Sequence, residues 1–248
     1  MMENELLATC LLAGRIMIEG GSEMYRVDDT MTRIAQNAGA HSARVFTTPT
    51  GLFVGVDGPA AVQIAPVAQR GIDMEKVAGV NNLSRQFAAG ALTLTQLHQA
   101  LEKLDAHTPF FPVWLQILAA GLCSTTLMVI FAQAYDWFDM PLAALVGAAG
   151  FAVYYKVSRL TKLQFISELL GAFAVALFAW LGVRVGIGRS LNNIIIGAVM
   201  PLVPGVAITN SIRDMLAGHL LSGMARGMEA ILSACAIGAG VAIIFRFF

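Results

Sequence analysis

The chain has 248 residues, of which 57% are hydrophobic and 13% are charged, and its mean hydropathy is +0.69. Soluble globular domains rarely have this composition. The formal net charge is zero and no basic run occurs, which argues against nucleic acid as a partner. Of the 16 Asp and Glu residues, 11 precede Phe111. We therefore predict two parts, an aqueous domain at residues 1–110 and a transmembrane domain at residues 111–248.

The first part carries alternating signals for helices and strands. Helical periodicity appears at residues 5–18, 23–37, 73–89 and 93–105. Three short stretches, rich in Val, Phe and Thr and separated by turn signals, predict an antiparallel meander at residues 42–48, 51–56 and 61–65. Asp73 and Thr93 are suited to cap the third and fourth helices. This pattern predicts a small α+β domain.

The second part reads as apolar blocks, each long enough for a transmembrane helix. The blocks cover residues 113–134, 141–157, 163–183, 191–210 and 222–245. One joint between blocks is basic, with Lys156, Arg159 and Lys162. The joint at residues 136–139 has no Lys or Arg, so the positive-inside rule places the basic joint in the cytoplasm, although Arg184 and Arg189 on the other side weaken the bias. We expect a bundle of about five transmembrane helices. We also expect the N-terminus to be cytoplasmic, because the first residues lack the features of a secretory signal.

The fourth block is interrupted by Pro201, Pro204 and Gly205. Prolines within a span free backbone carbonyls that lipid cannot bond, so these groups must face protein or water. Transporters commonly build substrate sites from such broken helices. The alternative is that Pro204 only kinks a packed helix.

Polar residues follow this break. Asn210 and Asp214 are four residues apart and share one helix face, behind a helix start whose amides and positive dipole end suit a carboxylate. We predict a substrate-binding set of Pro204, Gly205, Asn210 and Asp214, and a gate at the cytoplasmic exit of Arg213, His219 and Arg226. The alternative is that these polar residues merely end the helix at the membrane interface.

Glu168 lies inside the third block. A carboxylate toward mid-membrane costs about 2.5 to 3.5 kcal/mol unless it is paired, protonated or hydrated. We predict that Glu168 and Asp214 couple transport to protons. The alternative is that Glu168 lies near the headgroups and pairs with Lys162 or Arg159.

No signal for catalysis or for a metal occurs. Cys10, Cys123 and Cys235 are far apart, and neither a nucleophile elbow nor a phosphate loop is present. We expect no metal and no cofactor. Ser22 followed by acids reads as a helix N-cap rather than as an active site.

Several motifs resemble those of the threonine/serine exporter (ThrE) family. They are the stretch from Gly20 to Met31 (GGSEMYRVDDTM), Thr47-Thr48, the stretch from Arg70 to Met74 (RGIDM), the stretch from Val80 to Arg85 (VNNLSR), and Pro204-Gly205 with Asn210, Asp214, Gly218-His219, Gly223 and Arg226. The resemblance covers nearly the whole chain. It is closest to the longer subunit of the split, YjjP-like form.

The resemblance implies a secondary transporter in the inner membrane of a bacterial cell rather than an enzyme. It implies export of small carboxylate-bearing metabolites, either threonine and serine or dicarboxylates such as succinate, driven by the proton gradient. It also implies an oligomer with a second small membrane subunit. The family motif in the first part comprises Glu23, Arg26, Thr47, Thr48, Arg70 and Gly71.

An alternative function comes from a different class. A membrane-anchored enzyme or regulatory protein would carry its activity in residues 1–110. An anchor needs neither five spans nor prolines within one of them, so the sequence favours the exporter. A passive channel would differ by a flux independent of the proton gradient.

Overall fold

The computed structural model describes residues 2–56, 62–68, 71–107, 111–133 and 135–247, and its chain forms two units. The first unit comprises Met1–Pro109 with Val206–Met228, and the second comprises Phe110–Gly205 with Glu229–Phe248. The predicted division into an aqueous and a transmembrane domain at residue 110 stays a prediction; Val206–Met228, which follow that residue, belong to the first unit. Which of these residues lie in a membrane stays a prediction.

The helices and strands expected in the first unit are confirmed, with ends that differ from the prediction by at most three residues. They are α1 (Met2–Glu19), α2 (Met24–Asn37), β1 (Ala43–Thr48), β2 (Gly51–Val56), β3 (Gln63–Pro66), α3 (Met74–Ala88) and α4 (Leu94–Ala106). The predicted start of the third strand, residue 61, lies outside the described residues. Both predicted caps form, since Asp73 accepts a hydrogen bond from the Lys76 amide and Thr93 makes a capping box with Gln96.

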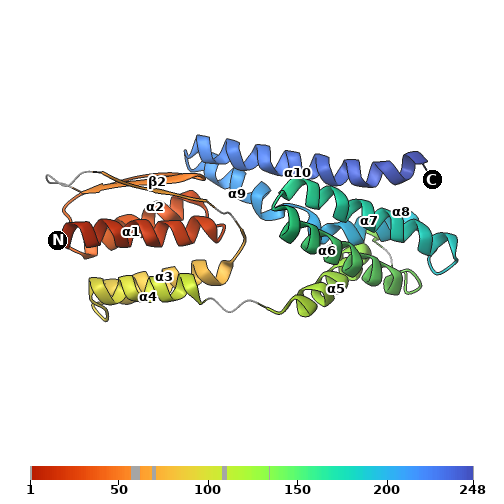
Figure 1. Ribbon diagram of the computed structural model, residues 1–248, viewed down its shortest axis with the longest axis horizontal. Helices are drawn as coiled ribbons and strands as arrows, with labels where there is room; N and C mark the ends of the chain where they lie inside the picture. The colour runs from red at the N-terminus through yellow and green to blue at the C-terminus, as the bar shows by residue number, and fades with distance from the viewer. Residues whose placement is uncertain (1, 57–61, 69–70, 108–110, 134, 248) are drawn as a thin grey trace. The chain divides into compact units, whose positions relative to one another are not determined.

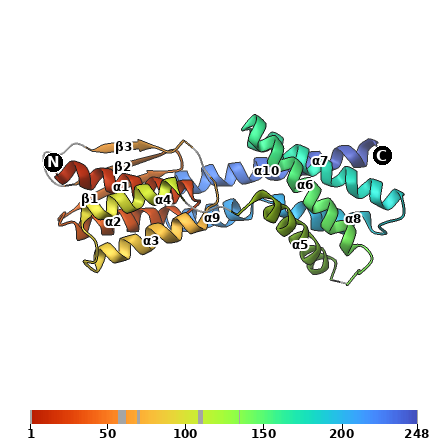
Figure 2. The ribbon, with the colours of Figure 1, turned by 60° about the horizontal axis from the view of Figure 1, so that its bottom comes forward.

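The first unit is layered. The antiparallel sheet, in the order β1-β2-β3, covers one side of the α1–α2 pair, and α3 and α4 cover the other side (Figures 1 and 2). Residues from all three layers are fully buried in one core, among them Ile16, Met31, Leu52 and Leu97. This core fixes the position of α2.

The turn between α1 and α2 is built from glycines and from the RGIDM motif. Gly71 donates its amide to the Glu19 carbonyl at 2.9 Å, and Asp73 donates to the Gly20 carbonyl at 2.9 Å, so two carbonyls at the end of α1 are satisfied. Gly21 has φ of +86°, and a Cβ added there would lie 2.9 Å from the Gly71 carbonyl oxygen. Arg70, the first residue of this motif, lies outside the described residues.

The second unit holds α5 (Val113–Ala132), α6 (Met140–Thr161), α7 (Gln164–Arg184), α8 (Leu191–Val199) and the 3-10 helix η1 (Met200–Leu202). The chain continues as α9 (Gly205–Leu216) and α10 (Leu220–Phe247), and α10 contributes to both units. Among the described helices, α5, α6, α7 and α10 are long and apolar enough to cross a membrane. A fifth span results if the broken pair Leu191–Leu202 and Gly205–Leu216 counts as one.

The fourth block holds two helices, α8 and α9, and the break between them contains the prolines noted in the sequence. Helix α8 ends at Val199, and Pro201 lies in the 3-10 turn that follows it. Pro204 precedes α9 and has no amide hydrogen to donate, so an α-helical ladder cannot run through this segment.

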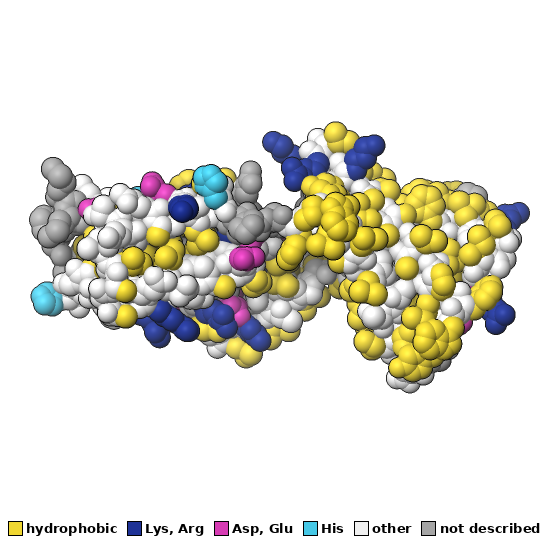
Figure 3. Space-filling view, turned by 90° about the horizontal axis from the view of Figure 1, so that it is seen from below, with side chains coloured by type: hydrophobic (Ala, Val, Ile, Leu, Met, Phe, Trp, Pro, Cys, Tyr) yellow, Lys and Arg dark blue, Asp and Glu magenta, His cyan; other side chains and the backbone are white. Residues whose placement is uncertain are grey.

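Glycines pack the second unit closely. A methyl group on Gly147 would collide with Ser124, on Gly150 with Val175, and on Gly240 with the Leu169 carbonyl, whereas Gly238 faces open space. The outer surface of this unit is largely apolar, as the yellow side chains in Figure 3 show. Exposed examples are Leu118, Leu122, Leu145 and Leu160. Such a surface suits contact with lipid.

A buried acid anchors the start of α8. Asp139 is 0% exposed and accepts hydrogen bonds from the Arg189 and Ser190 amides, each at 2.7 Å. The Arg189 guanidinium lies 4.4 Å from the centre of the Phe138 ring. These contacts join the loop before α6 to the loop before α8.

We predict that Gly21→Ala destabilises the chain more than Gly39→Ala does. Both glycines have positive φ, which costs an alanine about 1 to 2 kcal/mol, but only Gly21 also meets a backbone oxygen, since Gly39 has nothing within 4 Å. Thermal unfolding in detergent micelles, followed by circular dichroism, measures the difference. Equal melting temperatures for the two variants would contradict the tight packing of this turn.

Candidate functional site

Asp214, on α9, is 0% exposed and reaches the first residue of α2. Its Oδ1 accepts a hydrogen bond of 2.9 Å from the Met24 amide, and its Oδ2 lies 3.3 Å from Nη1 of Arg226 on α10. Glu23, the N-cap residue of α2, makes no capping bond with its own side chain. Asp214 therefore supplies both the acceptor and the negative charge that a helix N-terminus requires.

Three further side chains from α9 and α10 bind the same turn. Asn210 donates Nδ2 to the Gly21 carbonyl at 2.9 Å. Arg226 donates Nη2 to the Ser22 carbonyl at 2.7 Å, and Arg213 donates Nη1 to Oε1 of Glu23 at 2.7 Å. The residues that close the chain's first helical hairpin are thus held by residues almost 200 positions later in the sequence.

A second acid of α2 extends this arrangement. Thr47 of β1 donates its hydroxyl to Oδ1 of Asp28 at 2.6 Å, and Nε2 of His219 lies 3.8 Å from Oδ2 of Asp28. Burial raises the pKa of the Asp28 carboxyl above its usual value; the Asp214 charge adds to this, while Thr47 and His219 oppose it. We call the following set the turn cluster: the residues from Gly21 to Met24, Arg26, Asp28, Thr47, Asn210, Arg213, Asp214, His219 and Arg226.

Glu23 is the one carboxylate of the turn cluster bonded to two arginines. It lies 2.7 Å from Arg213 and 3.2 Å from Arg26. Burial alone would raise the pKa of Glu23, but hydrogen bonds from its own backbone amide and from Arg213 outweigh burial and hold the pKa below its usual value. Ser22 is not the N-cap we expected, because α2 begins at Met24 and its N-cap is Glu23.

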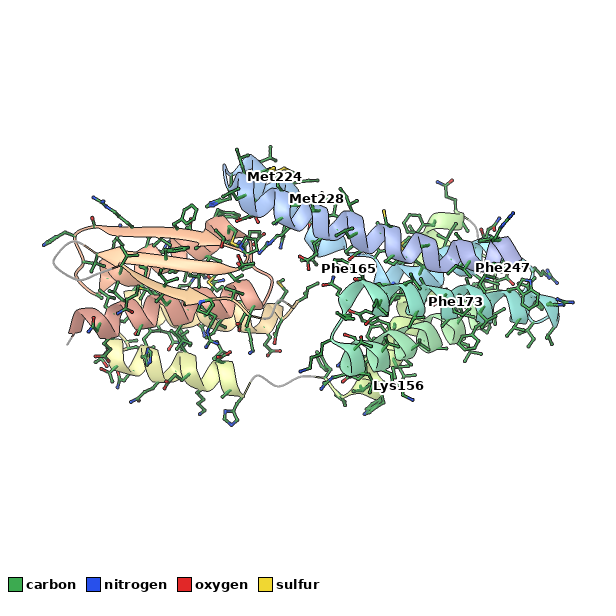
Figure 4. All side chains as sticks on the ribbon, turned by 45° about the horizontal axis from the view of Figure 1, so that its top comes forward. Lys156, Phe165, Phe173, Met224, Met228 and Phe247 are labelled. Carbon is green, nitrogen blue, oxygen red and sulfur yellow. The ribbon has the colours of Figure 1, made fainter. Side chains whose placement is uncertain are left out.

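Helix α10 presents two different faces in the first unit. Ser222 and Arg226 are 1% and 7% exposed, whereas Met224 and Met228, labelled in Figure 4, are more than half exposed. Ser211 of α9 donates its hydroxyl to the Gly223 carbonyl of α10 at 2.8 Å. Helices α9 and α10 are thereby fixed to each other beside the buried ion pair.

Glu168 forms a separate polar site in the second unit. It is 4% exposed, and its Oε1 accepts a hydrogen bond of 3.1 Å from Gln164, which also donates to Ser233 of α10 at 3.4 Å. Within the described part of the chain, Oε2 has no hydrogen-bond partner. No Lys or Arg there lies within 4.0 Å of either oxygen, so the alternative pairing with Lys162 or Arg159 does not occur.

The structure unites residues to which the sequence gave separate roles. The turn cluster contains the predicted substrate residues Asn210 and Asp214. It also contains all three residues of the predicted gate, which are Arg213, His219 and Arg226. Three residues of the family motif belong to it as well, namely Glu23, Arg26 and Thr47.

The remaining motif residues of the first unit have structural contacts. Thr48 closes the β1–β2 hairpin through hydrogen bonds between its hydroxyl and the backbone of Gly51, and Gly71 ends α1. Pro204 precedes α9, and Gly205 is the first residue of that helix.

Sequence reasoning missed the backbone groups of the turn cluster and the contact between Asp28 and His219. The Met24 amide and the Ser22 carbonyl are backbone groups, which carry no side-chain signal. Asp28 and His219 belong to two distant motifs, and no local pattern links them. In the described residues no group of three or more His, Cys, Asp or Glu could hold a metal ion.

Four described helices, or five if the broken pair counts as one span, are long and apolar enough to cross a membrane, which indicates a helical, multi-pass membrane protein. The profile of a family described as "Putative threonine/serine exporter" (ThrE) matches residues 8–248. The chain belongs to the ThrE threonine/serine exporter family, which is a family of membrane transporters.

Curated relatives are similar over nearly all of the chain. A "Probable threonine/serine exporter" of Mycobacterium tuberculosis is 22% identical over 246 residues, which is 98% of this chain but 46% of the relative. A "Probable succinate transporter subunit YjjP" is 23% identical in both Klebsiella aerogenes and Escherichia coli, over 94% of this chain and 90% of each relative. The chain therefore spans about half of the first relative and most of the YjjP proteins. No solved structure matches.

We predict that Arg226→Ala strongly destabilises the chain. It leaves Asp214 as an uncompensated charge in a fully buried position, which costs on the order of 3 to 5 kcal/mol. The double variant Asp214→Asn/Arg226→Gln removes both charges, so its free energy of unfolding should fall by less than that of Arg226→Ala. Denaturant unfolding in detergent micelles measures the cycle, with Arg246→Gln on an exposed part of α10 as control. A double variant less stable than Arg226→Ala would contradict the pairing.

We also predict that Asp28→Asn stabilises the chain near neutral pH. The pKa of Asp28 is higher in the folded than in the unfolded chain, so ionisation weakens the fold as pH rises through these two values. Asparagine carries no charge and keeps an oxygen for Thr47. At about pH 7 the variant should have a higher melting temperature than wild type. At about pH 3 the two melting temperatures should be equal, because aspartate is protonated in both the folded and the unfolded chain. The exposed Asp29→Asn is the control, and no gain at neutral pH would contradict the burial of Asp28.

Proposed function

We propose that this chain is one subunit of an exporter of small carboxylate-bearing metabolites, driven by the proton gradient and completed by a second, small membrane subunit. Membership of the ThrE family supports transport. The similarity to YjjP over 90% of those proteins, each named as a succinate transporter subunit, supports the split form. The Mycobacterium tuberculosis relative, of which the chain covers 46%, keeps threonine and serine as candidate substrates.

The observation that carries this proposal is the Asp214–Arg226 pair. An ion pair with an acid at 0% and an arginine at 7% exposure contributes little net stability, because desolvation offsets the attraction. A substrate carboxylate is chemically equivalent to the Asp214 side chain. In our proposal it competes with Asp214 for Arg226, so that substrate binding is linked to the ionisation of Asp214.

Glu168 is the second proton site in this proposal. Its Oε2 has no hydrogen-bond partner among the described residues and no neighbouring cation offsets its charge. A buried carboxyl of this kind suits reversible protonation. The basic joint at Lys156, Arg159 and Lys162 supports an orientation with residues 1–110 in the cytoplasm, in the inner membrane of a bacterium. Pro204 and Gly205 remain proposed parts of the substrate path.

Efflux from cells preloaded with labelled threonine, serine or succinate tests this function. The chain is expressed alone or with a candidate small membrane subunit, each with and without an uncoupler. We expect efflux of one substrate class that requires both chains and stops with the uncoupler. Efflux of none of the three, with both chains inserted, would contradict the exporter and favour an activity of residues 1–110. Efflux that is unchanged by the uncoupler would indicate a passive channel.

The same assay tests the role of Glu168. Glu168→Gln keeps the size and the hydrogen-bonding oxygen but cannot ionise, so efflux should lose its pH dependence while insertion stays normal. Glu75→Gln, at an exposed site on α3, is the matched control. If Glu168→Gln keeps the pH dependence of wild type, Glu168 has a structural role.

A further inference from the structure

A groove of about 340 Å³ opens on the first unit between α2 and α3. Three of its lining side chains are arginines, Arg26 and Arg33 from α2 and Arg85 from α3, and one is an acid, Asp29. Its volume suits a small molecule. Most of its lining residues lie in the GGSEMYRVDDTM and VNNLSR motifs. Of these four charged residues, Arg26 belongs to the turn cluster and the other three do not.

The charges of the groove are only partly balanced. Arg33 pairs with Asp29 at 2.9 Å, and Arg26 pairs with Glu23 at 3.2 Å. Arg85 makes no ion pair and no side-chain hydrogen bond to any residue that the structure describes. The groove therefore carries excess positive charge, with one guanidinium available to bind an anion.

Two hydroxyl groups add hydrogen-bond donors to the groove. Thr30 and Ser84 line it, are 4% and 6% exposed, and donate no hydrogen bond within the described residues. Hydroxyls in helices commonly donate to the carbonyl of the preceding turn, as Thr161 does to Val157 at 2.9 Å. Neither hydroxyl is among the fully buried atoms of the described residues that lack a partner, so each is accessible, and a ligand oxygen in the groove can accept its hydrogen bond.

We propose that this groove binds a small dianion, whose oxygens accept hydrogen bonds from Arg85, Thr30 and Ser84, while Arg26 and Arg33 add positive charge. Carboxylate and phosphate oxygens share this chemistry, so a dicarboxylate and a phosphate are its two sources. The groove is a second site, separate from Asp214 and Arg226. Its occupancy requires neither transport nor a second subunit.

Isothermal titration calorimetry tests this site with the purified full-length chain in detergent micelles and sodium chloride at a fixed concentration. Succinate and inorganic phosphate are the probes. We expect at least one to bind, with Arg85→Gln weakening it by at least about tenfold and Ser84→Ala by about threefold or more. Arg44→Gln, at an exposed position of β1 outside the groove, should bind as wild type does. Circular dichroism checks that each variant is folded.

Each outcome decides between alternatives. Binding of phosphate alone or succinate alone supports the site and identifies the source of the dianion. Absence of binding by both probes, or equal affinity in Arg85→Gln and wild type, overturns the site. Calorimetry measures binding and not transport. If the chain exports substrate normally but neither probe binds in the calorimeter, the groove site is overturned while the proposed transport function stands.

Discussion

The structure of the first unit depends on one buried carboxylate. Asp214 is 0% exposed, and its two oxygens bind the Met24 amide and face Arg226. A charge in such a position is unfavourable unless its partners are fixed, so the turn between α1 and α2, the end of α9 and the start of α10 must form together. Asn210 and Arg226 complete the set by satisfying the Gly21 and Ser22 carbonyls.

This constraint explains why two motifs that are far apart in the sequence lie together in the first unit. GGSEMYRVDDTM supplies a glycine-rich turn and a helix start, and the late motif supplies the side chains that bind them. Helix α10 is uninterrupted from Leu220 to Phe247. Its first turns carry Arg226, and its later turns pack on α7 through Gly240.

Local patterns predicted most of the fold, because periodicity, caps and turn residues act within a few positions. The four helices and three strands of the first unit are of this kind, as are α5, α6 and α7. Long-range contacts were not predictable in this way. The sequence assigned Asp214 to a substrate site and Ser22 to a helix N-cap. In the structure Asp214 binds the Met24 amide and Glu23 is the N-cap, and the distant partners that hold this turn leave no periodic signal. The break in the fourth block was predictable because its prolines act locally.

The most direct test of this account is amide hydrogen exchange at Met24. The first amides of a helix have no partner within the helix, so protection at this position must come from Asp214. We expect slow exchange in wild type and faster exchange at Met24 in Asp214→Ala, while amides of the β1–β2 ladder exchange as before. Exchange at Met24 that is unchanged in Asp214→Ala would contradict the claim that α9 holds the first helical turn of α2.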